Sequence, residues 1–125
     1  MELDRPSSDG LPYEPFAVEL QRNGDLVVVQ PRGELDAATI PELRGALDAI
    51  ENFARLVLDL RGLSFIDSTG LHLLVELHER AQNDRFELTL IAPEPPLDKA
   101  IRLCGLDGTL PFAPAAFAVD SAPAA

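Results

Sequence analysis

A short apolar run near the middle of the chain constrains the fold more than any other feature. It comprises Leu56, Val57, Leu58 and Leu60, and only Asp59 interrupts it. Such a run is typical of a strand that is covered on both faces, so we expect it at the centre of a sheet. The strands predicted on either side alternate with helices. This order predicts parallel strands joined by right-handed crossover connections.

The segment before this run predicts a β-hairpin. Phe16, Val18 and Leu20 alternate with small or polar residues, which is the pattern of a half-buried strand. A second apolar segment covers residues 26–29, and Asn23-Gly24 lies between the two. We therefore expect a type I′ turn at Asn23-Gly24, because both central residues of that turn need positive φ.

The first helix is predicted to begin with a capping box, Thr39-Ile40-Pro41-Glu42. In that motif the Thr39 side chain closes a free amide of the first turn, and Glu42 reaches back. An apolar stripe follows at helical spacing and is expected to face the sheet. Its members are Ile40, Leu43, Leu47 and Ile50.

Further elements are a helix over residues 69–82, a strand over 86–91, and a helix over 96–104 that ends at Gly105. The 69–82 helix has a wider apolar arc than one sheet contact requires. The surplus either packs on a neighbouring helix, which we favour, or borders a partner-binding surface. Cys104 continues the apolar positions of the last helix and is predicted to be a buried structural thiol. The predicted fold class is α/β, a mixed sheet with helices packed on it.

Composition excludes several classes of function. The 125 residues suffice for one core, predicted over residues 16–113. We expect residues 1–15 to be disordered and the Ala/Pro-rich segment 114–125 to be flexible. The net charge of −11 opposes binding to nucleic acids and anionic membranes. One cysteine, no zinc spacing and no stretch of about 20 apolar residues indicate a cytoplasmic protein without a structural metal.

The segment that carries chemistry is Asp67-Ser68-Thr69-Gly70. We expect a loop after the central strand to deliver these residues to the first turn of the 69–82 helix. Free amides and the positive end of the helix dipole stabilise negative charge there, so a phosphoryl group on Ser68 would fit. By its local pattern alone, the segment favours a simpler interpretation, in which Asp67 or Ser68 is only an N-cap.

Two longer segments carry a family resemblance. GELDAATIPELRGAL at residues 33–47 and VLDLRGLSFIDSTGLHLL at 57–74 resemble the STAS family, and within it the bacterial anti-sigma factor antagonists. The resemblance covers residues 16–112 and implies a STAS-like sheet with packed helices. It implies that a partner anti-sigma kinase phosphorylates Ser68, that a phosphatase reverses this, and that only the unphosphorylated protein binds the anti-sigma factor. The implied partner-binding residues are Glu34, Asp36, Asp67, Ser68, Thr69, Gly70 and Leu71.

The resemblance thus predicts a regulatory protein with no catalytic residues, metal or cofactor. One alternative is a STAS scaffold subunit of a sensory or lipid-transport assembly. Another is an acyl-transfer enzyme that uses Ser68, which the lack of an evident histidine base and of an oxyanion loop opposes. His72 and His78 are six residues apart and lack the spacing of a zinc pair, and no phosphate-binding glycine motif is present. The sigma factor, kinase, phosphatase, oligomeric state and any ligand stay open.

Overall fold

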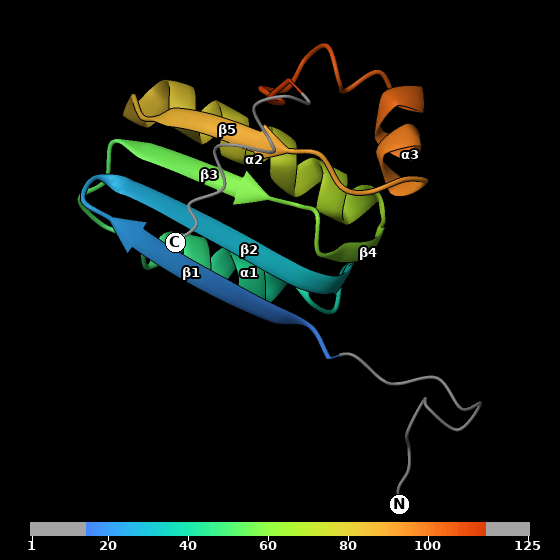
Figure 1. Ribbon diagram of the computed structural model, residues 1–125, viewed down its shortest axis with the longest axis horizontal. Coiled ribbons are helices and arrows are strands. Elements are labelled where there is room, and N and C mark those ends of the chain that lie inside the picture. Colours follow the sequence, from blue (N-terminus) through green and yellow to red (C-terminus); the bar gives the residue numbers. More distant parts are fainter. Residues whose placement is uncertain (1–14, 115–125) are drawn as a thin grey trace, which may run out of the picture.

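The computed structural model describes residues 15–114, which form a five-stranded mixed sheet and three helices (Figure 1). The strand order is β1-β2-β3-β5, and β4 pairs with β2 outside this path. β1 and β2 are antiparallel, whereas β2-β3, β3-β5 and β2-β4 are parallel. The elements are β1 (Ala17–Asn23), β2 (Leu26–Leu35), α1 (Ile40–Asp48), β3 (Arg55–Asp59), β4 (Leu63–Ile66), α2 (Ser68–Asp84), β5 (Glu87–Ile91) and α3 (Leu97–Leu103).

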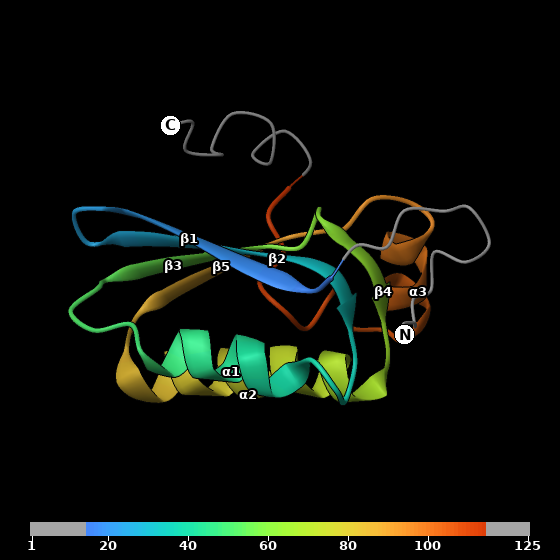
Figure 2. The ribbon, with the colours of Figure 1, turned by 90° about the horizontal axis from the view of Figure 1, so that it is seen from below.

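The fold class and the mixed sheet are confirmed. β3 lies between β2 and β5, and residues 56–59 of it are buried, so the apolar run does occupy the sheet interior. α1 and α2 cover one face of the sheet, and α3 lies beside β4 at its edge (Figure 2). The predictions for residues 1–14 and 115–125 concern segments outside the described residues.

The main core fills the space between the sheet and the two helices. On α2, Leu73, Leu74 and Leu77 are buried in it, and Leu71 and Val75 are partly buried and pack against the same cluster. The wide apolar arc of α2 is therefore used for packing within the domain. The cluster that these residues join contains residues of both α1 and the sheet.

The hairpin is present, but its turn differs by one residue from the prediction. Asn23 pairs with Leu26, which leaves Gly24 and Asp25 as the two turn residues. Gly24 has φ of 65°, and neither Asn23 nor Asp25 has positive φ. A positive φ at the first central position alone is typical of a type II′ turn, so the type I′ prediction was wrong. Leu20 also differs from the half-buried pattern, because it is 46% exposed.

The capping box predicted at the start of α1 is wrong. Thr39 occupies the N-cap position but makes no side-chain cap hydrogen bond. Its hydroxyl instead donates to the Glu34 carbonyl (2.7 Å) and accepts from the Asp36 amide (3.0 Å). The residue has helical φ and ψ of −102° and −14°, whereas a capping residue is usually extended.

The prediction of a buried Cys104 is also wrong. Cys104 is exposed at the C-cap of α3, and Ile101 is the buried residue of this helix. A helix of 7 residues offers too short a stripe to bury its last turn. Gly105 follows with φ of 77° and ends the helix as predicted. Among residues 15–114, no helix is long and apolar enough to cross a membrane.

Candidate functional site

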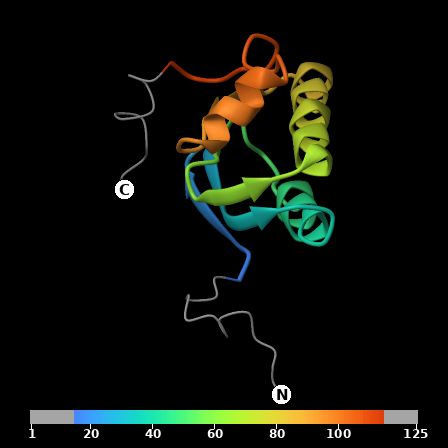
Figure 3. The same ribbon diagram turned by 90° about the vertical axis from the view of Figure 1, so that its right-hand side faces the viewer.

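A short strand that the sequence did not predict brings the two motif segments together. We expected a loop before Asp67, but residues 63–66 form β4, which runs parallel to the end of β2. Glu34 pairs with Phe65 and Leu35 with Ile66, after a register shift beside Gly33. The ends of β2 and β4 and the starts of α1 and α2 thus lie on one side of the molecule (Figure 3). Residues 33–35 form the last part of β2.

Asp67 caps α2, as the simpler interpretation of the motif predicted. Its carboxylate accepts hydrogen bonds from the Gly70 amide (3.0 Å) and the Thr69 hydroxyl (2.5 Å). The Thr69 hydroxyl first, and then the Gly70 amide, lower the pKa of Asp67, with smaller contributions from the amides of Thr69 and Ala37. Asp67 is therefore negatively charged at neutral pH.

Gly70 allows the first turn of α2 to lie directly on the strand ends. A Cβ atom at this position would lie 2.7 Å from Ile66 Cγ1, 3.1 Å from the Leu35 carbonyl oxygen and 3.2 Å from Leu35 Cδ2. The Asp67 amide also donates to that same Leu35 carbonyl (3.2 Å). The glycine of the motif therefore fixes the position of the helix start relative to β2 and β4.

Ser68 is the first residue of α2 and is exposed. Within the described residues its hydroxyl makes no hydrogen bond. His72 lies one turn further along α2, and its Nε2 pairs with Glu76 Oε2 at 3.5 Å rather than with Ser68. The hydroxyl is thus free to react with an approaching group. The first-turn amides and the helix dipole favour negative charge beside it.

Asp36 lies at the end of β2, where its carboxylate orders the turn into α1. Asp36 Oδ1 accepts from the Ala38 amide (3.0 Å), the Thr39 amide (3.1 Å) and the Thr39 hydroxyl (3.2 Å). Glu34, two residues earlier, is exposed. The sequence predicted both acids for this surface, but it did not indicate that the carboxylate of Asp36 has a local structural role.

The other predicted partner-binding residues differ in what they offer to a partner. Thr69 is exposed, although its hydroxyl is engaged with Asp67. Gly70 is buried, and Leu71 is partly buried against the core. Side chains open to a partner on these segments are therefore Glu34, Ser68 and Thr69. Phe65 joins them because it is 44% exposed. The sequence pattern did not indicate this residue, because a loop was expected in place of β4.

A buried acid holds the turn that leads into β4. Asp59 is 4% exposed and accepts hydrogen bonds from Arg61 Nε (2.9 Å), Arg61 Nη2 (2.8 Å) and Gln30 Nε2 (3.2 Å). Burial raises the pKa of this carboxyl, but the hydrogen bonds from Arg61 and Gln30 outweigh it, so the pKa is lowered. An open hollow of about 410 Å³ borders this pair. In the sequence, Asp59 was only an interruption of an apolar run.

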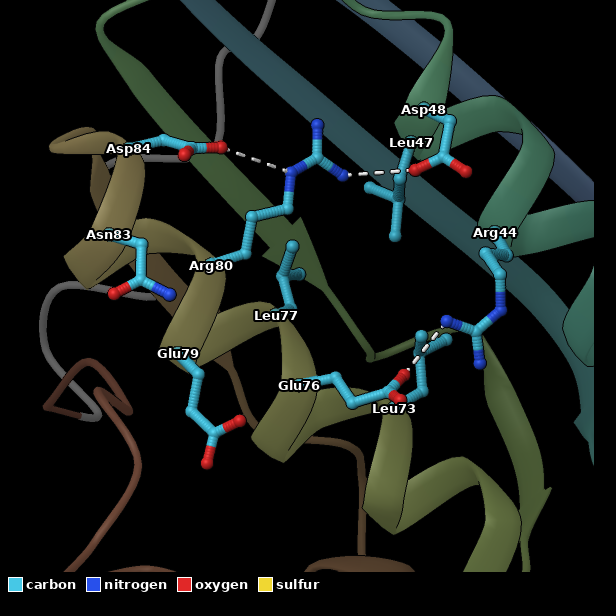
Figure 4. A pocket seen from close by; sticks show the side chains of 10 residues that line it. All are labelled: Arg44, Leu47, Asp48, Leu73, Glu76, Leu77, Glu79, Arg80, Asn83 and Asp84. Atoms are coloured by element: carbon cyan, nitrogen blue, oxygen red, sulfur yellow. Dashed lines mark hydrogen bonds and ion pairs between the residues drawn. The ribbon is translucent and has the colours of Figure 1, made fainter.

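A further hollow of about 340 Å³ lies between α1 and α2, away from Ser68 (Figure 4). Two ion pairs cross it from one helix to the other. Arg44 Nη1 lies 2.8 Å from Glu76 Oε1, and Arg80 Nη1 lies 3.1 Å from Asp48 Oδ1. These pairs join α1 to α2, and none of the predicted site residues lines this hollow. Residues 15–114 also contain no group of three or more side chains suited to a metal ion.

Comparison with known proteins identifies the family. The model of the STAS domain matches residues 17–116. The anti-sigma-B factor antagonist of Listeria monocytogenes is 31% identical over 88 residues, which cover 69% of this chain and 77% of the relative. An anti-sigma factor antagonist from Mycobacterium paratuberculosis superposes with a TM-score of 0.66 at 28% identity, covering 90% of this chain and 91% of that chain.

A second similar structure is the Bacillus cell fate determinant SpoIIAA in its phosphorylated form. It has a TM-score of 0.61 at 23% identity and covers 84% of this chain and 98% of that chain, and at this identity it shows the shared fold alone. The family match spans the described domain, and the relative from Listeria supports it over most of that length. The chain therefore belongs to the STAS domain family.

Proposed function

We propose that this protein is an anti-sigma factor antagonist that Ser68 switches. In its unphosphorylated state it binds an anti-sigma factor that has serine kinase activity. Phosphorylation of Ser68 by that kinase releases the complex, and a phosphatase restores binding. The observation that carries the proposal is the exposed Ser68 hydroxyl, which starts α2 without a hydrogen bond and lies on the side formed by both family motifs.

The identities of similar proteins support this proposal. The Listeria and Mycobacterium proteins are anti-sigma factor antagonists, and the Bacillus protein with the same fold exists in a phosphorylated form. A chain that acts on such a partner works in the cytoplasm. The Ser68 hydroxyl makes no hydrogen bond to His72 or to any other base among the described residues, as a serine nucleophile would. We therefore infer a regulatory protein rather than an enzyme.

The electrostatics of the helix start explain how the switch would act. A phosphoryl group adds about −1.5 to −2 charges at neutral pH. It would stand beside the ionised Asp67 carboxylate, on a chain whose net charge is already −11. The first-turn amides tolerate this charge locally. A partner surface that fits the neutral hydroxyl would have to desolvate the added charge, which costs several kcal/mol at the centre of an interface.

Phosphorylation is tested by incubating the protein with its cognate anti-sigma kinase and ATP, followed by peptide mapping. We expect phosphate on Ser68, and none in Ser68→Ala. Thr69 and Ser64 are also exposed hydroxyl residues nearby, so they serve as internal controls. Phosphate on either of these with Ser68 unmodified would refute the assignment.

Binding is tested by titration calorimetry of the wild type, Ser68→Ala, Ser68→Asp and Asn83→Asp against the anti-sigma factor. Asn83 is exposed near the other end of α2, about 22 Å from Ser68 at 1.5 Å per residue. Both aspartate variants change the net charge by the same amount. We expect only Ser68→Asp to weaken binding strongly. If it bound as tightly as wild type, the scaffold alternative within the STAS family would be the better interpretation.

A further inference from the structure

One exposed aromatic side chain lies within the proposed binding surface. Three large apolar residues are exposed in the described chain: Leu20 (46%), Phe65 (44%) and Leu103 (79%). Single exposed apolar residues are common on protein surfaces, so exposure alone indicates nothing. Phe65 differs from the others by its position, because it immediately precedes the Ile66-Asp67-Ser68 segment that starts α2.

Strand pairing places the Phe65 ring beside an acidic residue of the other motif. Phe65 on β4 is the direct partner of Glu34 on β2, and both residues are exposed. Paired residues on neighbouring strands project from the same face of a sheet. The next pair, Leu35 and Ile66, is buried and therefore projects into the core. Phe65 and Glu34 thus lie side by side on the outer face of the strand ends.

Three acidic residues lie at or next to the ends of these two strands. Glu34 is adjacent, and Asp36 and Asp67 end the two strands on which Glu34 and Phe65 lie. The carboxylates of Asp36 and Asp67 are held by amides and by the Thr39 and Thr69 hydroxyls, so they are fixed in place. Aromatic side chains are enriched among the residues that carry binding energy, and polar residues typically surround them. Phe65 with acidic residues near it has the composition of such an anchor and its polar surroundings.

We propose that Phe65 is the apolar anchor of the partner interface. It fits a protein surface that offers an apolar pocket bordered by arginine or lysine side chains. Phe65 fills the pocket, and Glu34 pairs with a basic side chain at the rim of the pocket. Ser68 lies at the start of α2, where a phosphoryl group would disrupt the same contact. The inference rests on the proposed function, because the partner that carries this pocket is the anti-sigma factor.

The test compares Phe65→Ala with Leu20→Ala in titrations against the cognate anti-sigma factor. Leu20 is matched to Phe65 in exposure and lies on a strand, but it pairs with Val29 of β2, five residues before the Glu34 that Phe65 pairs with. We expect Phe65→Ala to weaken binding by about 30-fold or more, the effect of truncating an interface anchor. Leu20→Ala should bind within about threefold of wild type, as expected outside an interface. Phe65→Leu, which keeps an apolar side chain, should recover part of the loss.

Three further readouts decide the interpretation. Circular dichroism and thermal melting of Phe65→Ala should match those of Leu20→Ala, which separates lost contact from lost folding. Glu34→Gln should weaken binding by no more than about fivefold and reduce its salt dependence, as expected of a rim charge. If Ser68→Asp weakened binding while Phe65→Ala bound like wild type, the anchor would be refuted and the proposed function would stand. If the wild type did not bind the anti-sigma factor, both would fall.

Discussion

Replacing Gly70 by alanine tests whether close packing fixes the start of α2. The added Cβ would lie 2.7 Å from Ile66 Cγ1 and 3.1 Å from the Leu35 carbonyl oxygen. Neither atom is the free end of a flexible side chain, because Ile66 is buried and the carbonyl belongs to the backbone of β2. Such overpacking typically costs about 1 to 3 kcal/mol. The higher helix propensity of alanine than of glycine offsets about 1 kcal/mol of this cost.

Gly45→Ala is the matched control for this substitution. Gly45 lies within α1 and is exposed, and a Cβ added there would have no atom within 4 Å. This variant should gain the helix propensity alone, so its melting temperature should rise by a few degrees. Gly70→Ala should melt below Gly45→Ala by about 4 to 8 °C for each kcal/mol of overpacking. Calorimetric melts of the three proteins measure this. If Gly70→Ala were stabilised as much as Gly45→Ala, the argument that Gly70 is needed for packing would be refuted.

Three other changes have defined outcomes. Asp59→Asn should lower the free energy of unfolding at neutral pH. Because the pKa of Asp59 in the folded protein lies below its usual value of 3.8, this loss of stability should persist above that pH and shrink as the pH falls through the folded pKa. Urea midpoints across this range measure the loss, and a loss that grows in acid would contradict the pairing. Ser68→Ala should shift stability by no more than about 0.5 kcal/mol, because Asp67 and not Ser68 caps the helix; a cooperative unfolding at room temperature would make Ser68 a structural residue. Cys104 should react stoichiometrically with a thiol reagent in the native protein, since it is exposed; protection until unfolding would restore the prediction of a buried thiol.

The sequence predicted the parts of the fold that depend on long apolar patterns. The run at residues 56–60 lies within the sheet, and the periodicity over 69–82 matches α2 to within two residues at each end. The secondary structure of these segments is set by burial against a large core, and the spacing of their apolar residues indicates that burial directly. The parallel order of β2, β3 and β5 followed from the alternation of strands and helices.

Elements decided by a few local contacts were harder to predict. β4 has four residues, two of them exposed, and forms through pairing with a distant part of the chain, so it has no periodicity to detect. The hairpin turn shifted by one residue because Asn23 takes part in strand pairing and leaves the positive φ to Gly24. Thr39 bonds backward to Glu34 and Asp36 instead of capping α1. In each case tertiary or turn geometry outweighs the local preference of the residue.

The position of Ser68 follows from these local contacts rather than from the motif alone. Pairing of β4 with β2 brings Asp67 under the Leu35 carbonyl, and Gly70 lets the helix start pack on the same strand ends. The serine lies between these two anchored residues, but its own hydroxyl is outside every contact that holds them. A charge added there changes the surface without opposing the packing beneath it. In the proposed function, phosphorylation of Ser68 therefore acts on the surface that the domain offers to a partner, with the fold unchanged.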